Sequence, residues 1–159
     1  MNTYSRRSSF FAIASGAAVV LCRICSPAVA AQSSPTNRPH AYHANPPTGP
    51  LPVTIDPSEL RGNRKAFVIY SVAAQIRELM YQVPCYCGCD EIRGHESLLD
   101  CFTTRHGITC GLCQKEALFC YLERTAKTPA EIREALATGK ANVDLESFVD
   151  DFPEQTNLR

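Results

Sequence analysis

The residues with the most distinctive chemistry in this chain are cysteines, seven of which lie between Cys85 and Cys120. Three alternate with other residues in the segment 84–89, and Cys110 and Cys113 form a Cys-x-x-Cys pair. Thiolates bind soft or borderline metal ions, and thiols also form disulfides or take part in redox exchange. The spacing therefore restricts the chemistry to metal binding, disulfide stabilisation or thiol redox.

The alternate spacing of Cys85, Cys87 and Cys89 favours a shared metal over a mutual disulfide. In an extended backbone their side chains point the same way, with neighbouring Cα atoms about 6.5 to 7 Å apart. A disulfide prefers Cα atoms about 4.4 to 6.8 Å apart with converging Cβ vectors, so it would be strained here. Thiolates about 2.3 Å from one zinc ion lie about 4 Å apart, which a bend at Gly88 would permit.

The second pair, Cys110 and Cys113, brackets the start of a predicted helix over 111–127. Free N–H groups and the helix dipole favour thiolates at such a position. His95 lies between the two cysteine groups, where it either binds metal or caps a short helix. The predicted metal ligands are Cys85, Cys87, Cys89, Cys101, Cys110, Cys113 and His95.

Three neighbouring residues are expected to stay outside the ligand set. His106 lies in a polar loop and is expected to be solvated. Cys120 falls two helical turns after Cys113, about 10 Å along the axis, and is expected to be a small buried hydrophobe. Glu116 could accept hydrogen bonds behind the ligands or lie on an exposed helix face.

Several familiar cofactor and enzyme patterns do not fit. Attachment of c-type haem needs a histidine directly after the Cys-x-x-Cys pair, but Gln114 stands there. The ferredoxin spacing is absent, and no strand is expected before Cys110, as a thioredoxin-like pair would require. No hydrolytic triad stands out, so a non-catalytic protein is favoured and enzymatic activity is left open.

Residues 1–30 are typical of a signal peptide that is removed. The segment combines Ser5-Arg6-Arg7, an apolar run to Leu21 and a small-residue cleavage site at Ala28-Val29-Ala30. Its paired arginines resemble a twin-arginine export signal, with ordinary secretion as the alternative. We therefore predict an exported protein of the periplasm or cell envelope, cleaved after Ala30 and without a transmembrane helix. Cys22 and Cys25 would leave with the leader.

Residues 31–57 are predicted to be a flexible linker because they are rich in proline and lack aliphatic periodicity. His40 and His43 lie in this segment and are expected to be solvated. The linker is followed by a predicted helical domain over 58–152 and a C-terminal tail over 153–159.

The domain is predicted to be all-α, with two longer helices and several short ones organised around the cysteines. Asp56 and Thr128 each cap a predicted helix start, with a glutamate three residues later. A helix before Pro84 has its apolar side at Ile69, Val72, Ala73, Ile76, Leu79, Met80 and Val83. A short helix is predicted over 96–102. The helix over 111–127 should bury Leu112, Phe119, Leu122 and Ala126, and Leu145, Phe148, Val149 and Phe152 predict a last short one.

The charge balance argues against a nucleic-acid partner. The whole chain has 16 basic and 16 acidic residues, but three arginines lie in the leader, so the mature chain is net acidic.

Seven cysteines remain after cleavage, an odd number that disulfides within one monomer cannot pair completely.

The segment 84–89, with Gly94-His95, the run 97–102, Cys110-x-x-Cys113 and Glu116-Ala117, resembles the bacterial PCYCGC-motif proteins. The resemblance covers residues 63–138 and implies a small extracytoplasmic helical domain whose biochemical role is unsettled. Many such proteins are lipoproteins. Here Val19-Val20-Leu21 before Cys22 lacks the small residues expected ahead of a lipidated cysteine, and a proline-rich spacer is present instead.

The leading hypothesis is an extracytoplasmic metal-binding protein that holds zinc or copper(I) and acts in structure, storage or delivery. A disulfide-stabilised envelope interaction domain without metal is the alternative, and a thiol redox protein using Cys110 and Cys113 is the third. The expected partners are the metal ion and an envelope protein.

Overall fold

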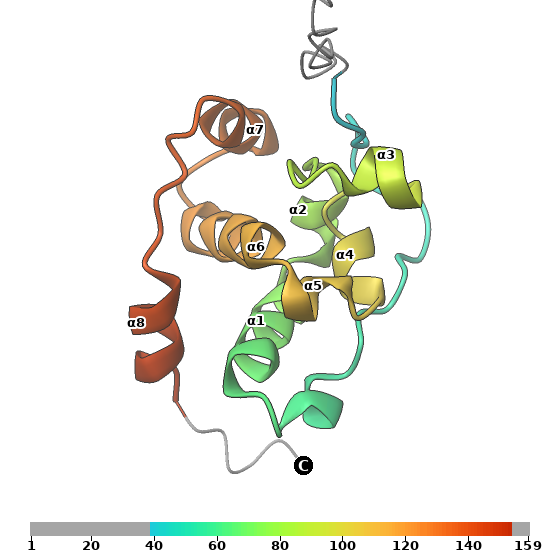
Figure 1. The fold of residues 1–159 in the computed structure, drawn as a ribbon. Helices are drawn as coiled ribbons and strands as arrows, with labels where there is room; N and C mark the ends of the chain where they lie inside the picture. The colour runs from blue at the N-terminus through green and yellow to red at the C-terminus, as the bar shows by residue number, and fades with distance from the viewer. Residues whose placement is uncertain (1–38, 154–159) are drawn as a thin grey trace, which may run out of the picture. The chain divides into compact units, whose positions relative to one another are not determined.

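The computed structural model of the chain describes residues 39–153, and the regular elements in that range are all helices (Figure 1). A 3₁₀ helix, η1, precedes eight α-helices, and no strand occurs among these residues. The all-α prediction is confirmed. The elements are η1 (Pro57–Leu60), α1 (Arg64–Gln75), α2 (Arg77–Tyr81), α3 (Cys89–Arg93), α4 (Asp100–Thr103), α5 (His106–Thr109), α6 (Gly111–Glu123), α7 (Pro129–Ala137) and α8 (Leu145–Asp151).

The two longest helices, α1 and α6, pack against each other and carry much of the core. Helix α1 buries Val68, Ile69 and Val72, and α6 buries Ala117 and Leu118. Helix α8 packs on both of them. Burial of apolar side chains along these faces stabilises the part of the fold on which the cysteine-bearing segments rest.

Side-chain caps begin four helices as local sequence predicts. Asp56 accepts from Ser58 N–H at the start of η1, and Thr128 forms a capping box with Glu131 at the start of α7. Asn63 and Asp144 cap α1 and α8. The predicted starts at Asp56 and Thr128 are confirmed.

The predicted apolar helix before Pro84 is interrupted at Ile76, which separates α1 from α2. Its predicted inward residues are nevertheless buried, with Leu79 partly so. The short helix predicted over 96–102 is confined to α4, but Leu98, Leu99 and Phe102 are fully buried as expected. Helix α8 forms over the last predicted amphipathic segment.

The predicted inward face of α6 is wrong at three positions. Leu112 and Leu122 are 44% and 48% exposed, and Ala126 lies in the exposed turn after the helix. Of that set only Phe119 is buried. Polar residues account for the error, because Gln114 and Glu116 occupy the buried side of α6 and disguise its apolar pattern.

The described part of the proline-rich segment has no helix before η1 but packs on the domain. His40 Nδ1 lies 3.2 Å from Asp90 Oδ2, and the His43 ring stacks on Tyr81 with centroids 3.8 Å apart. Ile55 N–H donates to the Phe102 carbonyl at 3.0 Å. The two histidines are half-buried, which differs from the solvated side chains expected in a flexible linker. Figure 1 shows this segment, in cyan and blue-green, passing α3 and α4 before η1.

The predicted signal peptide, its cleavage site and the first part of the predicted linker lie outside the described residues, as do residues 154–159 of the predicted tail. Between residues 39 and 153, no helix has the length and apolar character needed to cross a bilayer.

Candidate metal centre

The triple-cysteine segment wraps between α2 and α3. Gly88 has φ +78° and ψ 13°, a left-handed conformation that glycine adopts without the strain a Cβ would add, and α3 begins at Cys89. The predicted bend at Gly88 is confirmed. Ahead of this bend, Cys85 Sγ and Cys87 Sγ lie 3.3 Å apart.

A second group of candidate ligands comes from α4 and the loop before it. Cys101 lies in α4, and its Sγ is 3.5 Å from Cys89 Sγ and 3.3 Å from His95 Nδ1. The Asp100 carboxylate accepts from the backbone N–H groups of Glu96 and Ser97, which fixes the turn between His95 and α4. Helix α4 thereby brings the buried thiol of Cys101 to Cys89, and the turn before α4 brings the imidazole of His95 to Cys101.

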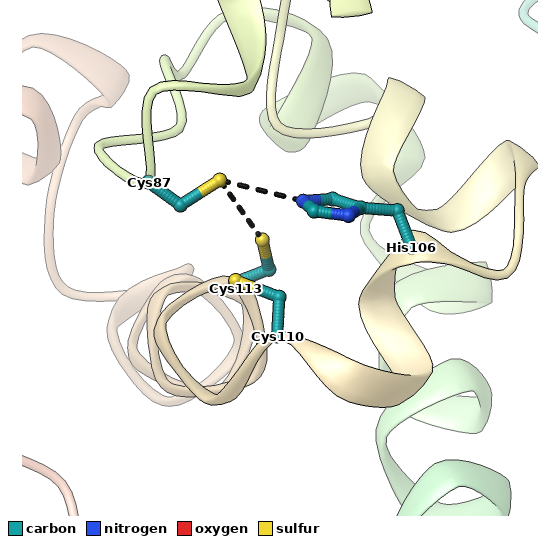
Figure 2. A group of neighbouring side chains, drawn as sticks. All are labelled: Cys87, His106, Cys110 and Cys113. Carbon is teal, nitrogen blue, oxygen red and sulfur yellow. Dashed lines mark hydrogen bonds between the residues drawn. The ribbon is translucent and has the colours of Figure 1, made fainter. Parts of the chain in front are cut away.

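The third group comes from α5 and the start of α6 (Figure 2). His106 is the first residue of α5, Cys110 is the N-cap residue of α6, and Cys113 lies in the first turn of α6. Cys87 Sγ lies 3.4 Å from His106 Nε2 and 3.6 Å from Cys113 Sγ. Cys113 Sγ is also 3.4 Å from Cys85 Sγ.

These contacts join into one connected set of ligand atoms. Four overlapping groups each have all their ligand atoms within 4.8 Å of one another, compared with sulfurs about 4 Å apart around one tetrahedral zinc. The cluster could therefore hold a metal ion. The groups are Cys87, His106, Cys110 and Cys113; Cys85, Cys101 and Cys113; Cys85, Cys87 and Cys89; and Cys89, Cys101 and His106.

All six predicted ligand cysteines belong to this cluster. His95 belongs to none of the four groups but contacts Cys101 directly. Cys120 is fully buried and outside the groups found among the described residues, as expected of a packing residue. The seven described cysteines are all free thiols.

The expectation that His106 is solvated is wrong. The loop that contains it folds as α5, and its ring is half-buried against Cys87 and edge-on to His95. A signal was available in the sequence. His106 precedes Cys110 by four residues, a spacing that places two side chains on one side of a helical turn.

Glu116 lies behind the cysteines and is buried, which selects the acceptor role over an exposed helix face. Its Oε1 accepts from Tyr86 N–H at 3.0 Å, between Cys85 and Cys87, and its Oε2 is buried without a hydrogen-bond partner. Burial raises the pKa of Glu116 to about 7. The carboxyl group holds the backbone of the triple-cysteine segment against α6.

Crowding of the thiols shifts their pKa values unequally. A hydrogen bond from Cys101 lowers the pKa of Cys85, but the contact with Cys113 and burial raise that pKa overall. Burial also raises the pKa of Cys89, to about 11. Burial opposes ionisation of Cys87 as well, yet hydrogen bonds from Cys85, Cys89 and Cys113 bring its pKa below the usual value. The raised pKa values favour the protonated thiols of Cys85 and Cys89 when no cation is bound, so metal binding there would release protons.

Burial also lowers the pKa of both histidines of the cluster. For His95 burial outweighs the opposing charge of Asp100, and for His106 the Arg93 charge adds to the effect. The neutral imidazole is the form that binds metals. The histidines are thus in the right form for ligation at neutral pH.

Comparison with known proteins identifies one family. The sequence model of a family described as proteins of unknown function with a PCYCGC motif matches residues 50–151. No curated protein and no solved structure matches the chain.

Proposed function

The chain belongs to the PCYCGC-motif family, and from its cysteine centre we propose that it is a metal-binding protein of the cell envelope that holds zinc or copper(I). The observation that carries the proposal is that one thiol lies close to two other thiols at once. Cys85 Sγ lies 3.3 Å from Cys87 Sγ and 3.4 Å from Cys113 Sγ. A disulfide uses each sulfur once, whereas a metal gathers several sulfurs around one point.

The ligand types favour soft or borderline ions. Six thiols and two imidazoles suit zinc or copper(I), whereas calcium and magnesium take oxygen ligands. Ions surrounded by cysteine and histidine have no open position for a substrate. Structure, storage or delivery of metal therefore fits the centre better than catalysis.

The cellular location is part of the proposal and rests on the leader sequence. Residues 1–30 have the pattern of an export signal with paired arginines. That route carries proteins already folded in the reducing cytoplasm. Thiols that bind metal before export would be protected from oxidation in the envelope.

Close sulfur pairs also support the second candidate, a disulfide-stabilised envelope interaction domain. Cys89 Sγ and Cys101 Sγ lie 3.5 Å apart and come from different elements, so oxidation would link α3 to α4. The third candidate, redox exchange at Cys110 and Cys113, has both thiols within 4.8 Å. It would require a reversible two-electron couple that Cys110→Ser abolishes.

Metal analysis with a free-thiol count on protein recovered from its native compartment tests the proposal. We expect stoichiometric zinc or copper and few disulfides. Cys87→Ser should reduce the metal content, whereas Cys120→Ala, the matched change at the cysteine outside the cluster, should not. Absence of metal together with six oxidised cysteines would establish the disulfide alternative instead.

A further inference from the structure

The cluster has more ligand atoms than one ion uses. Six thiols and two imidazoles lie in contact, but zinc in proteins takes about four ligands. Cys120, which lies outside the cluster, is not counted among these eight residues. The number of ions that the centre binds is therefore a question that the geometry can address.

The eight ligands can be divided into two sets that share no residue. The sets adjoin, because His106 lies within 4.8 Å of Cys89 and Cys101, and Cys113 lies within 4.8 Å of Cys85 and Cys101. In the first, which we call the outer subsite, Cys87, His106, Cys110 and Cys113 have all four ligand atoms within 4.8 Å of one another. In the second, the inner subsite, every pair of Sγ atoms among Cys85, Cys89 and Cys101 is also within 4.8 Å. His95 Nδ1 lies 3.3 Å from Cys101 Sγ, and this contact makes His95 the candidate for the fourth ligand of the inner subsite.

The two sets differ in access to solvent. The inner thiols of Cys85, Cys89 and Cys101 are 3%, 2% and 0% exposed. In the outer subsite Cys87, His106 and Cys110 are half-buried, and Cys113 alone is fully buried. Solvent and small chelators therefore reach an outer ion before an inner one.

From these observations we infer that the centre binds two metal ions, an outer ion that exchanges and an inner ion that is retained. This inference rests on the proposed function. The subsites touch through Cys85 Sγ, which is 3.3 Å from Cys87 Sγ and 3.4 Å from Cys113 Sγ. An ion can pass between them by exchanging one sulfur at a time. Each thiol that binds gives its proton to solvent, and the oxidation state of the ion does not change.

The positions of the two subsites indicate the order in which an arriving metal ion contacts them. An ion arriving from solvent binds at Cys110, His106 and Cys87 first, because these residues line the accessible side of the cluster. From there it reaches the buried thiols through Cys85, or directly from His106 and Cys113, whose ligand atoms also lie within 4.8 Å of inner thiols. The outer subsite is thus the point of loading and release, and the inner subsite holds the ion that closes α3 onto α4.

Titration of the reduced, metal-free full chain with Zn²⁺, followed by native mass spectrometry, tests the inference. We expect two zinc ions per chain, released to a chromophoric chelator in a fast and a slow phase of equal amplitude. The double variant His106→Ala/Cys110→Ser should lose one ion and the fast phase while keeping the slow phase. Cys120→Ala is the control and should keep both ions and both phases.

The outcomes separate this inference from the proposed function. No bound zinc or copper in any form would overturn the proposed function itself. One ion per wild-type chain, or more than two, would leave metal binding intact and overturn the two-subsite arrangement. Two ions released in a single phase would overturn the distinction between outer and inner. Loss of both ions from the outer double variant, with its helical circular dichroism unchanged, would do the same.

Discussion

Helices α1, α6 and α8, which we call the base, contrast with the cysteine segment, residues 84–110. Helices α1 and α6 have 12 and 13 residues, whereas α3, α4 and α5 have five, four and four. Asn63 and Asp144 cap α1 and α8, but none of α3, α4 and α5 has a side-chain cap. Isolated helices this short are not stable in water, so tertiary contacts must hold the cysteine segment.

Two kinds of tertiary contact are available to the cysteine segment. Leu98, Leu99 and Phe102 are fully buried and attach α4 to the base, and Tyr70 O–H donates to the Thr104 carbonyl at 2.6 Å. On the other side lie the thiols, whose mutual contacts replace an apolar core. The contrast teaches that the base is stabilised mainly by apolar burial and by its helix caps, whereas on the proposed function the geometry around α3 and α5 depends on the metal that the thiols bind.

Removal of the metal is expected to have the largest effect and to distinguish the cysteine segment from the base. With free metal at about a thousand times its dissociation constant, binding adds about 4 kcal/mol to stability, and a chelator removes it. We expect hydrogen exchange to accelerate strongly in α3 and α5 but little in α1 and α6. Exchange measured with and without chelator checks this. Equal loss of protection in both regions would show that the domain is one cooperative unit.

A change in the base should have the opposite pattern. Leu118 is fully buried in α6, and Leu118→Ala should destabilise the domain by about 2 to 5 kcal/mol because it leaves a cavity. The bound metal per folded chain should not change. Urea unfolding measures the free energy of unfolding, and metal analysis measures the bound metal. The control is Leu122→Ala, at an exposed position of the same helix, which should lower the free energy of unfolding by less than about 0.5 kcal/mol. A fall in metal content in proportion to stability would remove the distinction between the regions.

The smallest effect concerns Glu116, where the regions meet. Because burial raises its pKa from 4.5 to about 7, the folded state loses stability as pH rises from about 4.5 to about 7. In metal-free, reduced protein, Glu116→Gln should therefore gain up to about 3 kcal/mol relative to wild type between pH 4.5 and pH 8. Urea unfolding at both pH values measures the gain. The exposed Glu134→Gln is the control, and a gain that does not change with pH would contradict the assignment.

Local signals predicted the starts of η1 and α7 and the inward faces of α1 and α2 because they depend on nearby residues, but they misplaced three of the four inward residues of the helix predicted over 111–127. The caps at Asp56 and Thr128 and the apolar spacing from Ile69 to Val83 are short-range patterns, and the structure confirms them. The break at Ile76 was not predicted, since the apolar spacing continues across it.

The cysteines that form the cluster were also predictable, but the residues that they contact were not. Cys-x-Cys and Cys-x-x-Cys spacing identified the thiols from residue type alone, whereas the contact of Cys87 with His106 depends on how α5 folds back. The same dependence on distant contacts explains why the inward face of α6 was predicted wrongly. Glu116 is buried because the backbone N–H of Tyr86, 30 residues earlier, donates to it, and no periodicity in α6 contains that information.

The packed proline-rich segment gives the domain a direction in which it would transmit mechanical force. Tension applied ahead of Pro39 would be carried first by the contact of His40 with Asp90, one residue after Cys89, and next by His43 on Tyr81. Surface immobilisation or a fusion through this end would therefore pull on α3. Attachment beyond α8 would load the base instead, so the choice of anchoring end decides whether a force experiment probes the thiols or the core.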